Sequence, residues 1–250
     1  MDKIFLSAST GLYTLAFGLA WANKTRKLAV GLALLATMVA LGYLFLRYYR
    51  AWPMTPMYLG TVSIPPFLAL FGLLSFLGSQ PDDQKLGLPL TFGLCWALSL
   101  LNIFFPKDFY LPFLKTASLF SQAHLAFNFL GKAGFLLAGV WACLAFRPRF
   151  RPDVGRIRWW LAIGYVFWTL SMLTGEVWSY LGWGLPVVWD EAVIVCFMAT
   201  WFFYAAVLHL FVTNRHPLVS RLLAAGGLGW IFLVNVPPDL GPGRWPPTLW

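Results

Sequence analysis

Charge is scarce in this sequence, and its scarcity excludes most soluble folds. Only 11% of the 250 residues are charged, whereas a soluble domain carries about 25%. Apolar runs of about 20 residues recur instead, and each is long enough to cross about 30 Å of hydrocarbon. These runs lack the alternation of polar and apolar residues that is typical of a membrane β-barrel. We therefore predict an all-α fold, a polytopic bundle of transmembrane helices.

Cysteine is also scarce, and no CxxC spacing occurs. The three cysteines, Cys95, Cys143 and Cys196, all lie inside apolar runs. This placement indicates small buried core residues rather than a zinc or dithiol site. The formal net charge of +9 does not favour nucleic-acid binding either, because Lys and Arg lie between the apolar runs and not on one face.

We predict a single integral membrane domain over residues 1–250, with about eight spans. The first apolar run has no small-residue cleavage site after it, so we expect it to be a span and not a removed signal. The spans are expected at about 4–22, 28–46, 59–78, 86–105, 123–146, 159–181, 192–212 and 219–236.

Lys and Arg predict the orientation of the bundle. The segments after spans one, three, five and seven contain eleven of them, and the segments on the other side contain six. Positive residues favour the cytoplasmic side, so we predict both termini on the outer side. For a bacterial inner membrane, the segment between spans six and seven then faces the periplasm.

That segment, residues 174–191 (TGEVWSYLGWGLPVVWDE), is named here the Trp-rich segment. It contains Trp178, Trp183 and Trp189, ends on Asp190 and Glu191, and has no basic residue. One interpretation is an ordinary aromatic belt at the membrane interface. The other is an aromatic shelf with an acidic edge that holds a flat, apolar ligand.

The fifth span carries a polar stripe. His124, Asn128 and Lys132 are spaced four apart and so share one helix face, with Lys132 about 12 Å from His124. A charge at that depth faces the bundle interior and needs a partner, and Glu176 is the candidate. A structural ion pair or a snorkelling Lys is one interpretation; the wall of a ligand cavity, with Lys132 against a ligand carboxylate, is the other.

Three further expectations concern the rest of the chain. His209 lies about 27 Å along span seven from Glu191, where it is either an interfacial residue or a ligand. Residues 106–122 are predicted to form an interfacial helix that leads to His124. The tail from Pro237 is rich in Pro and Gly, and we expect it to be non-helical and to fold over the outer face.

Several motifs make the sequence similar to a known family. WGLPVVWDE resembles the tryptophan-rich WWD signature of haem-handling proteins in cytochrome c maturation, of the CcsA/ResC type, with relatives among the CcmC, CcmF and HemX types. TGEVWSYLGWG resembles the lead-in to that signature, and YAAVLH the end of the next helix. LPFLKTASLFSQAH resembles the segment that leads to an outer His, and RYYRAWPMTPMYL the stretch before the third span.

The resemblance implies a function and a set of residues. Family members hold a b-type haem at the outer face, transiently or stably, and present it to apocytochrome c with a ResB/CcsB-like membrane partner. His124 matches an outer iron ligand, and His209 matches a membrane His that receives haem from the cytoplasmic side. Trp183, Gly184, Trp189 and Asp190 match the signature, and Trp178 lies in its lead-in. The enzymatic role implied is at most the haem-channel subunit of a haem lyase, and no catalytic residue is predicted.

The sequence also departs from the family pattern, and this keeps other functions open. The departures are Val187 for a third Trp, Glu191 for a Pro, Leu59 for a Glu, Glu176 for a small residue and Trp245 for the second outer His. A non-enzymatic anchor subunit of a larger respiratory or redox complex, with lipid or quinone in the pocket, is the alternative. A HemX-like regulator that binds a cytoplasmic enzyme through the Arg-rich loop 147–158 is a third.

Overall fold

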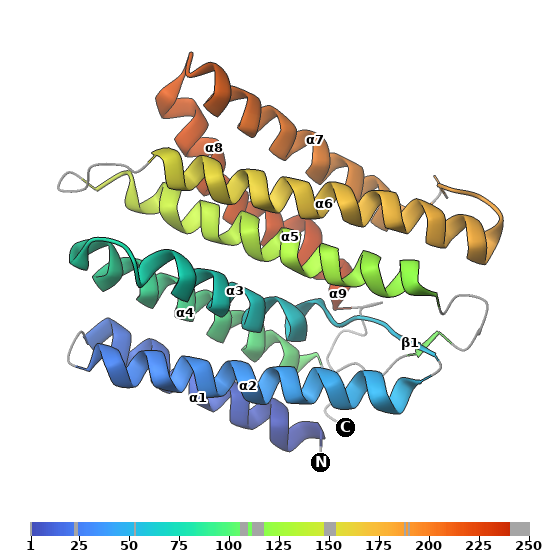
Figure 1. Ribbon diagram of the computed structural model, residues 1–250, viewed down its shortest axis with the longest axis horizontal. Helices are drawn as coiled ribbons and strands as arrows, with labels where there is room; N and C mark the ends of the chain where they lie inside the picture. The colour runs from blue at the N-terminus through green and yellow to red at the C-terminus, as the bar shows by residue number, and fades with distance from the viewer. Residues whose placement is uncertain are drawn as a thin grey trace. The chain divides into compact units, whose positions relative to one another are not determined.

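In the computed structural model, helices occupy almost all of the chain that is described, namely residues 2–22, 25–52, 54–105, 110–111, 118–147, 154–187, 189 and 191–240. The main helices are α1 (Asp2–Ala22), α2 (Arg26–Ala51), α3 (Gly60–Phe76), α4 (Pro81–Phe104), α5 (Leu119–Leu144), α6 (Val154–Trp183), α7 (Ala192–Thr213) and α8 (Pro217–Trp230). A π-helical turn, η2 (Ile231–Asn235), and the short α9 (Val236–Asp239) continue α8 (Figure 1). The predicted all-α fold is confirmed.

Six of the eight predicted spans coincide with helices that are long and apolar enough to cross a membrane. They are α1, α2, α4, α5, α7 and the helix made by α8 with its continuation. The third predicted span, α3, is apolar but only 17 residues long. The sixth predicted span corresponds to α6, which has 30 residues. It is not among the helices that meet both the length and the composition expected of a membrane span. The side on which the termini lie stays a prediction.

Contacts group the chain into two compact units. The first contains α1 to α4, with α4 packed against both α1 and α3. The second contains α5 to α8 with η2, and α5 runs beside α6 along most of its length (Figure 1). The single membrane domain over residues 1–250 stays a prediction.

Small residues bring α5 and α6 into close backbone contact. A Cβ atom added at Gly134 would lie 2.8 Å from the Cα of Gly164, and one at Gly131 would lie 3.1 Å from the backbone nitrogen of Trp168. Between membrane helices, where apolar side chains gain little over lipid, such close packing drives association. These contacts also fix the antiparallel register of the two helices.

A two-stranded pairing corrects the prediction for residues 106–122. Tyr110–Leu111 form β2, which pairs antiparallel with β1, Thr55–Pro56, and α5 already begins at Leu119. The predicted interfacial helix is therefore wrong at Tyr110–Leu111, because backbone pairing with a distant stretch replaces helical bonds there. Residues 106–109 and 112–117 lie outside the described residues.

The start of the Pro-rich tail is also a correction. Pro237 and Pro238 belong to α9 and are helical, although the tail was predicted to be non-helical. The preceding turn is π-helical, and proline is tolerated where local π or 3₁₀ geometry adjusts the backbone. Residues 241–250 of the tail, including Trp245, lie outside the described residues.

A buried polar network ties α7 to the end of α8. Thr200 Oγ1 accepts hydrogen bonds from Asn235 Nδ2 and Trp230 Nε1, both at 2.9 Å, and donates to the Cys196 carbonyl at 2.8 Å. A hydroxyl has two acceptor positions and one donor, so all hydrogen-bonding positions of the Thr200 hydroxyl are occupied. Thr200 is completely buried, and its hydroxyl holds the π-helical turn against α7.

Replacing Thr200 with Val is expected to lower the free energy of unfolding by about 1–2 kcal/mol, because two buried N–H groups lose their acceptor. Thr213→Val is the matched control, since the exposed Thr213 hydroxyl bonds only to backbone carbonyls of its own helix. Chemical unfolding of both variants in detergent measures the difference. Equal stability of the two variants would contradict this role for Thr200.

Candidate functional site

His124 lies in a pocket of side chains from three helices of the second unit. It projects from α5 at the level of Ser171 and Gly175 on α6. Its ring centroid is 5.5 Å from those of Trp178 on α6 and Phe197 on α7. Gly175 makes room for it, because a Cβ there would lie 2.6 Å from His124 Nδ1.

Hydrogen bonds fix the tautomer of this imidazole. Nδ1 lies 2.8 Å from the backbone carbonyl oxygen of Ser171 and 3.2 Å from its hydroxyl. A carbonyl oxygen only accepts, so Nδ1 carries the proton and donates it. The Ser171 hydroxyl also donates to the His124 carbonyl at 2.9 Å. In the neutral ring, Nε2 then has its lone pair available to a metal, which is how a second partner orients a ligating histidine.

The aromatic neighbours of His124 are themselves held in place. Trp168 stacks on Phe197 with centroids 4.0 Å apart and an interplanar angle of 16°, and its Nε1 donates to the Phe197 carbonyl at 3.2 Å. Trp168 is fully buried, and Trp178 is 9% exposed. Phe197, which packs on His124, is therefore held in place by Trp168.

Much of the Trp-rich segment is helical rather than a loop. Glu176, Trp178 and Trp183 all belong to the last turns of α6, and Trp183 packs edge-on against Trp178 at 5.6 Å. Gly184 then leaves the helix with φ of +78°, a conformation that glycine adopts without strain.

A hydrogen bond fixes the turn beyond α6, and the tryptophans on either side of this turn are exposed. Ser179 Oγ donates to the carbonyl of Leu185 at 2.7 Å and draws the turn back onto the helix. Trp183 and Trp189 are 54% and 63% exposed. Asp190 lies outside the described residues. The segment thus presents two accessible indoles, and that of Trp183 packs against the buried Trp178, which contacts the half-buried His124.

Lys132 has a different partner from the predicted one. It is 2% exposed, and its Nζ donates to the backbone carbonyl of Asn235 in η2 at 3.2 Å. Glu176 follows Gly175, which contacts His124, and Lys132 lies about 12 Å further along α5. The register of α5 and α6 therefore separates Lys132 from Glu176. Asn128, between His124 and Lys132, is buried, and its Oδ1 has no hydrogen-bond partner among the described residues.

His209 lies far from His124. It is exposed on α7, twelve residues beyond Phe197, which corresponds to about 18 Å of helix. The two histidines therefore do not ligate one ion. No group of three or more His, Cys, Asp or Glu suited to a metal occurs in the part of the chain that is described. All three cysteines are free: Cys95 is buried, as predicted, whereas Cys143 and Cys196 are half-buried.

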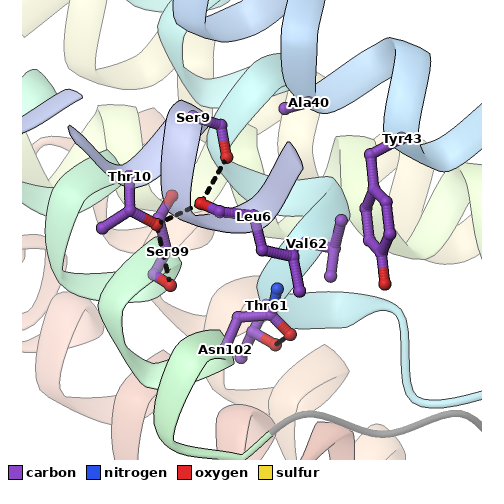
Figure 2. A pocket seen from close by; sticks show the side chains of 9 residues that line it. All are labelled: Leu6, Ser9, Thr10, Ala40, Tyr43, Thr61, Val62, Ser99 and Asn102. Carbon is purple, nitrogen blue, oxygen red and sulfur yellow. Dashed lines mark hydrogen bonds between the residues drawn. The ribbon is translucent and has the colours of Figure 1, made fainter. Parts of the chain in front are cut away.

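A cavity in the first unit is too small for a large ligand. It measures about 10 Å³ and is lined by Ser9, Thr10, Tyr43, Thr61, Ser99 and Asn102, together with Leu6, Ala40 and Val62 (Figure 2). Thr61 Oγ1 donates a hydrogen bond to Asn102 Oδ1 at 3.5 Å on one side of it (Figure 2). This volume is about that of one water molecule. The cavity among α1 to α4 is therefore too small to be a cofactor pocket.

Sequence reasoning did not predict Ser171, Gly175 or Phe197 as neighbours of His124. A usable signal was present, because Ser171 and Gly175 lie four apart on an otherwise bulky helix and so share a face. Two small residues on one face mark a place where a side chain from another helix enters.

Comparison with known proteins gives a partial match. The cytochrome c biogenesis protein CcsA of Prochlorococcus marinus strain MIT 9312 is 38% identical over 85 residues, covering 32% of this chain and 25% of that protein. CcsA of P. marinus subsp. pastoris strain CCMP1986 is 36% identical over 71 residues, covering 27% and 21%. This chain thus spans a quarter or less of these curated relatives. No family model and no solved structure matches it.

The predicted resemblance to CcsA-type proteins is thereby supported over about a third of the chain. The apolar helices and this similarity together indicate a multi-pass membrane protein related in part to CcsA. The wider relation to the CcmC, CcmF and HemX types stays a prediction.

Proposed function

We propose that the protein is a membrane haem-handling subunit of cytochrome c maturation, which holds haem at the outer face of a bacterial inner membrane. The observation that carries the proposal is the His124 imidazole, whose Nδ1–H is committed to the Ser171 carbonyl. The partial similarity to CcsA, a cytochrome c biogenesis protein, supports it.

The residues around His124 fit a haem group. Haem, when bound, supplies an iron that takes a neutral imidazole as axial ligand. His124 would provide Nε2, and Trp178 would border the ring. The exposed indoles of Trp183 and Trp189 would lie against the flat apolar ligand, and burial of a tryptophan removes about 150–250 Å² from water or lipid. Asp190 and Glu191 are the proposed acidic edge, and Glu176 is the further acidic side chain proposed near the ligand.

The remaining site residues have separate proposed roles. His124 is the one imidazole described next to the Trp-rich segment, so a water molecule or a residue of a ResB/CcsB-like partner would supply any further ligand to the iron. His209, about 18 Å of helix beyond Phe197 on α7, is proposed to receive haem near the other membrane face. Lys132 is proposed to hold the α8 continuation, through the Asn235 carbonyl, beneath the haem position.

Purification of the full chain from haem-replete membranes tests this function. We expect about one haem per chain in a pyridine haemochrome assay, because one imidazole ligand is positioned. Absence of haem would overturn the proposal. Absence of haem together with stoichiometric copurification of redox subunits would favour the alternative, a non-enzymatic anchor in a larger membrane complex.

A substitution at Gly175 is expected to weaken haem binding without removing a ligand. The new methyl group of Gly175→Ala would lie 2.6 Å from His124 Nδ1, so the ring must turn and the bond to Ser171 is lost. We expect haem to dissociate about tenfold faster, in line with overpacking costs of about 1–3 kcal/mol. Transfer of haem to apomyoglobin measures the rate.

The control for this variant is Gly226→Ala. A Cβ at Gly226 has open space around it, and the residue lies on α8 in the same unit. Its dissociation rate should equal that of the unchanged protein. If Gly175→Ala also releases haem at that rate, the imidazole of His124 is not what retains it.

A further inference from the structure

The end of the second unit opposite the Trp-rich segment is strongly basic. It is formed by the last turns of α5 and α7 and the first turns of α6 and α8, because α6 packs antiparallel to both α5 and α7. Five arginines gather there, and we call them the Arg-rich end: Arg147, Arg156, Arg158, Arg215 and Arg221. The acidic side chains described in this unit, Glu176 and Glu191, lie at its other end.

Two of these arginines differ in their surroundings. The Arg156 guanidinium lies over the Trp141 ring, 4.9 Å from its centroid, and Trp141 is 3% exposed on α5. Arg221 lies on α8 at the last turn of α5, and its Nε is buried with no hydrogen-bond partner among the described residues. A buried donor that lacks an acceptor is destabilising. The site therefore offers a donor that an anionic oxygen would satisfy.

The apolar surface beside the arginines indicates what carries that oxygen. Large apolar side chains next to them in sequence are exposed: Phe146 by 42%, Trp159 by 64%, Leu218 by 60% and Leu222 by 53%. A soluble acidic protein or a free phosphate would leave these side chains in water. A phospholipid covers both parts, with its phosphate at the guanidinium groups and its acyl chains along the apolar residues.

We infer that the Arg-rich end binds anionic phospholipid, with Arg156 on α6 and Arg221 on α8 available to lipid phosphate groups and the neighbouring apolar side chains against the acyl chains. This site is independent of the haem site, since it involves neither His124 nor the Trp-rich segment. It would anchor the second unit at its basic end and fix its depth in the bilayer.

Native mass spectrometry of the full chain in detergent, titrated with phosphatidylglycerol or phosphatidylcholine, tests the inference. We expect phosphatidylglycerol to bind more tightly, and Arg156→Gln/Arg221→Gln to weaken it by about tenfold or more, at about 1 kcal/mol per cation. The control is Arg26→Gln/Lys27→Gln, which removes two exposed charges at the start of α2. That variant should bind as the unchanged protein does.

Other variants and ligands keep the inference falsifiable. Arg156→Lys/Arg221→Lys retains the charge, so it should bind more tightly than the Gln pair and also serves if the Gln pair fails to fold. Equal binding of the two phospholipids would overturn the inference. So would equal loss in the Gln pair and the α2 control, or displacement of the lipid by millimolar inorganic phosphate, which would indicate a simple anion site.

Discussion

Gly134→Leu is expected to lower the free energy of unfolding of the protein by about 3 kcal/mol, the upper part of the range for overpacking. A Cβ at this position would lie 2.8 Å from the Cα and 2.9 Å from the nitrogen of Gly164. Both are backbone atoms, so no rotamer change relieves the clash. The helices α5 and α6 must separate, and Phe135 then loses its packing contact with Gly164.

Gly229→Leu is the matched control for this variant. Gly229 lies on α8 in the same unit, is exposed, and has open space where its Cβ would be. Leu also has a better helix propensity than Gly by about 0.8 kcal/mol, so stability should stay equal or rise slightly. Unfolding in a graded detergent series measures both variants. A Gly134→Leu protein as stable as Gly229→Leu would show that α5 and α6 do not pack as closely as described.

His124→Ala is expected to reduce the haem retained per chain at least tenfold. The substitution removes the one imidazole described beside the Trp-rich segment, and stacking on indoles alone does not replace an iron–nitrogen bond. The Soret absorbance of protein purified from the same haem-replete membranes measures the loss. The packing around the site should survive, because Trp168 and Phe197 bond to each other and not through His124.

Two other histidines serve as comparisons. His216 is exposed and caps α8 without a side-chain bond, so His216→Ala should retain haem fully. His209→Ala should lower the amount of haem that is loaded. It should leave the position of the Soret band unchanged, because His209 lies on α7, far from His124, the proposed iron ligand. A band that moves in His209→Ala but not in His124→Ala would contradict the proposed assignment of the two residues.

The helical fold was largely accessible from the sequence because membrane insertion is governed by local composition. Runs of apolar residues located the helices to within a few residues: the predicted span 192–212, for example, corresponds to Ala192–Thr213. The strand at Tyr110–Leu111 was missed because its partner, Thr55–Pro56, is remote in sequence. A local pattern does not show such a pairing.

The site was only partly predictable, for a similar physical reason. The family resemblance grouped His124, Trp178 and Trp183, and in the structure Trp178 contacts both of the others. The partner of Lys132 depends on the register between helices. Glycines such as Gly134 set that register through contacts with another helix, and the sequence alone does not show which residues make these contacts. Lys132 therefore meets the Asn235 carbonyl rather than Glu176, and Ser171 emerged as the residue that fixes the His124 tautomer.

The most direct test of the central claim is the absorption spectrum of His124→Gly with and without added imidazole. The account predicts a Soret band in the unchanged protein, its loss in His124→Gly, and its return when imidazole occupies the space left by the side chain. A Soret band in His124→Gly equal to that of the unchanged protein, without imidazole, would contradict the claim that His124 holds the iron.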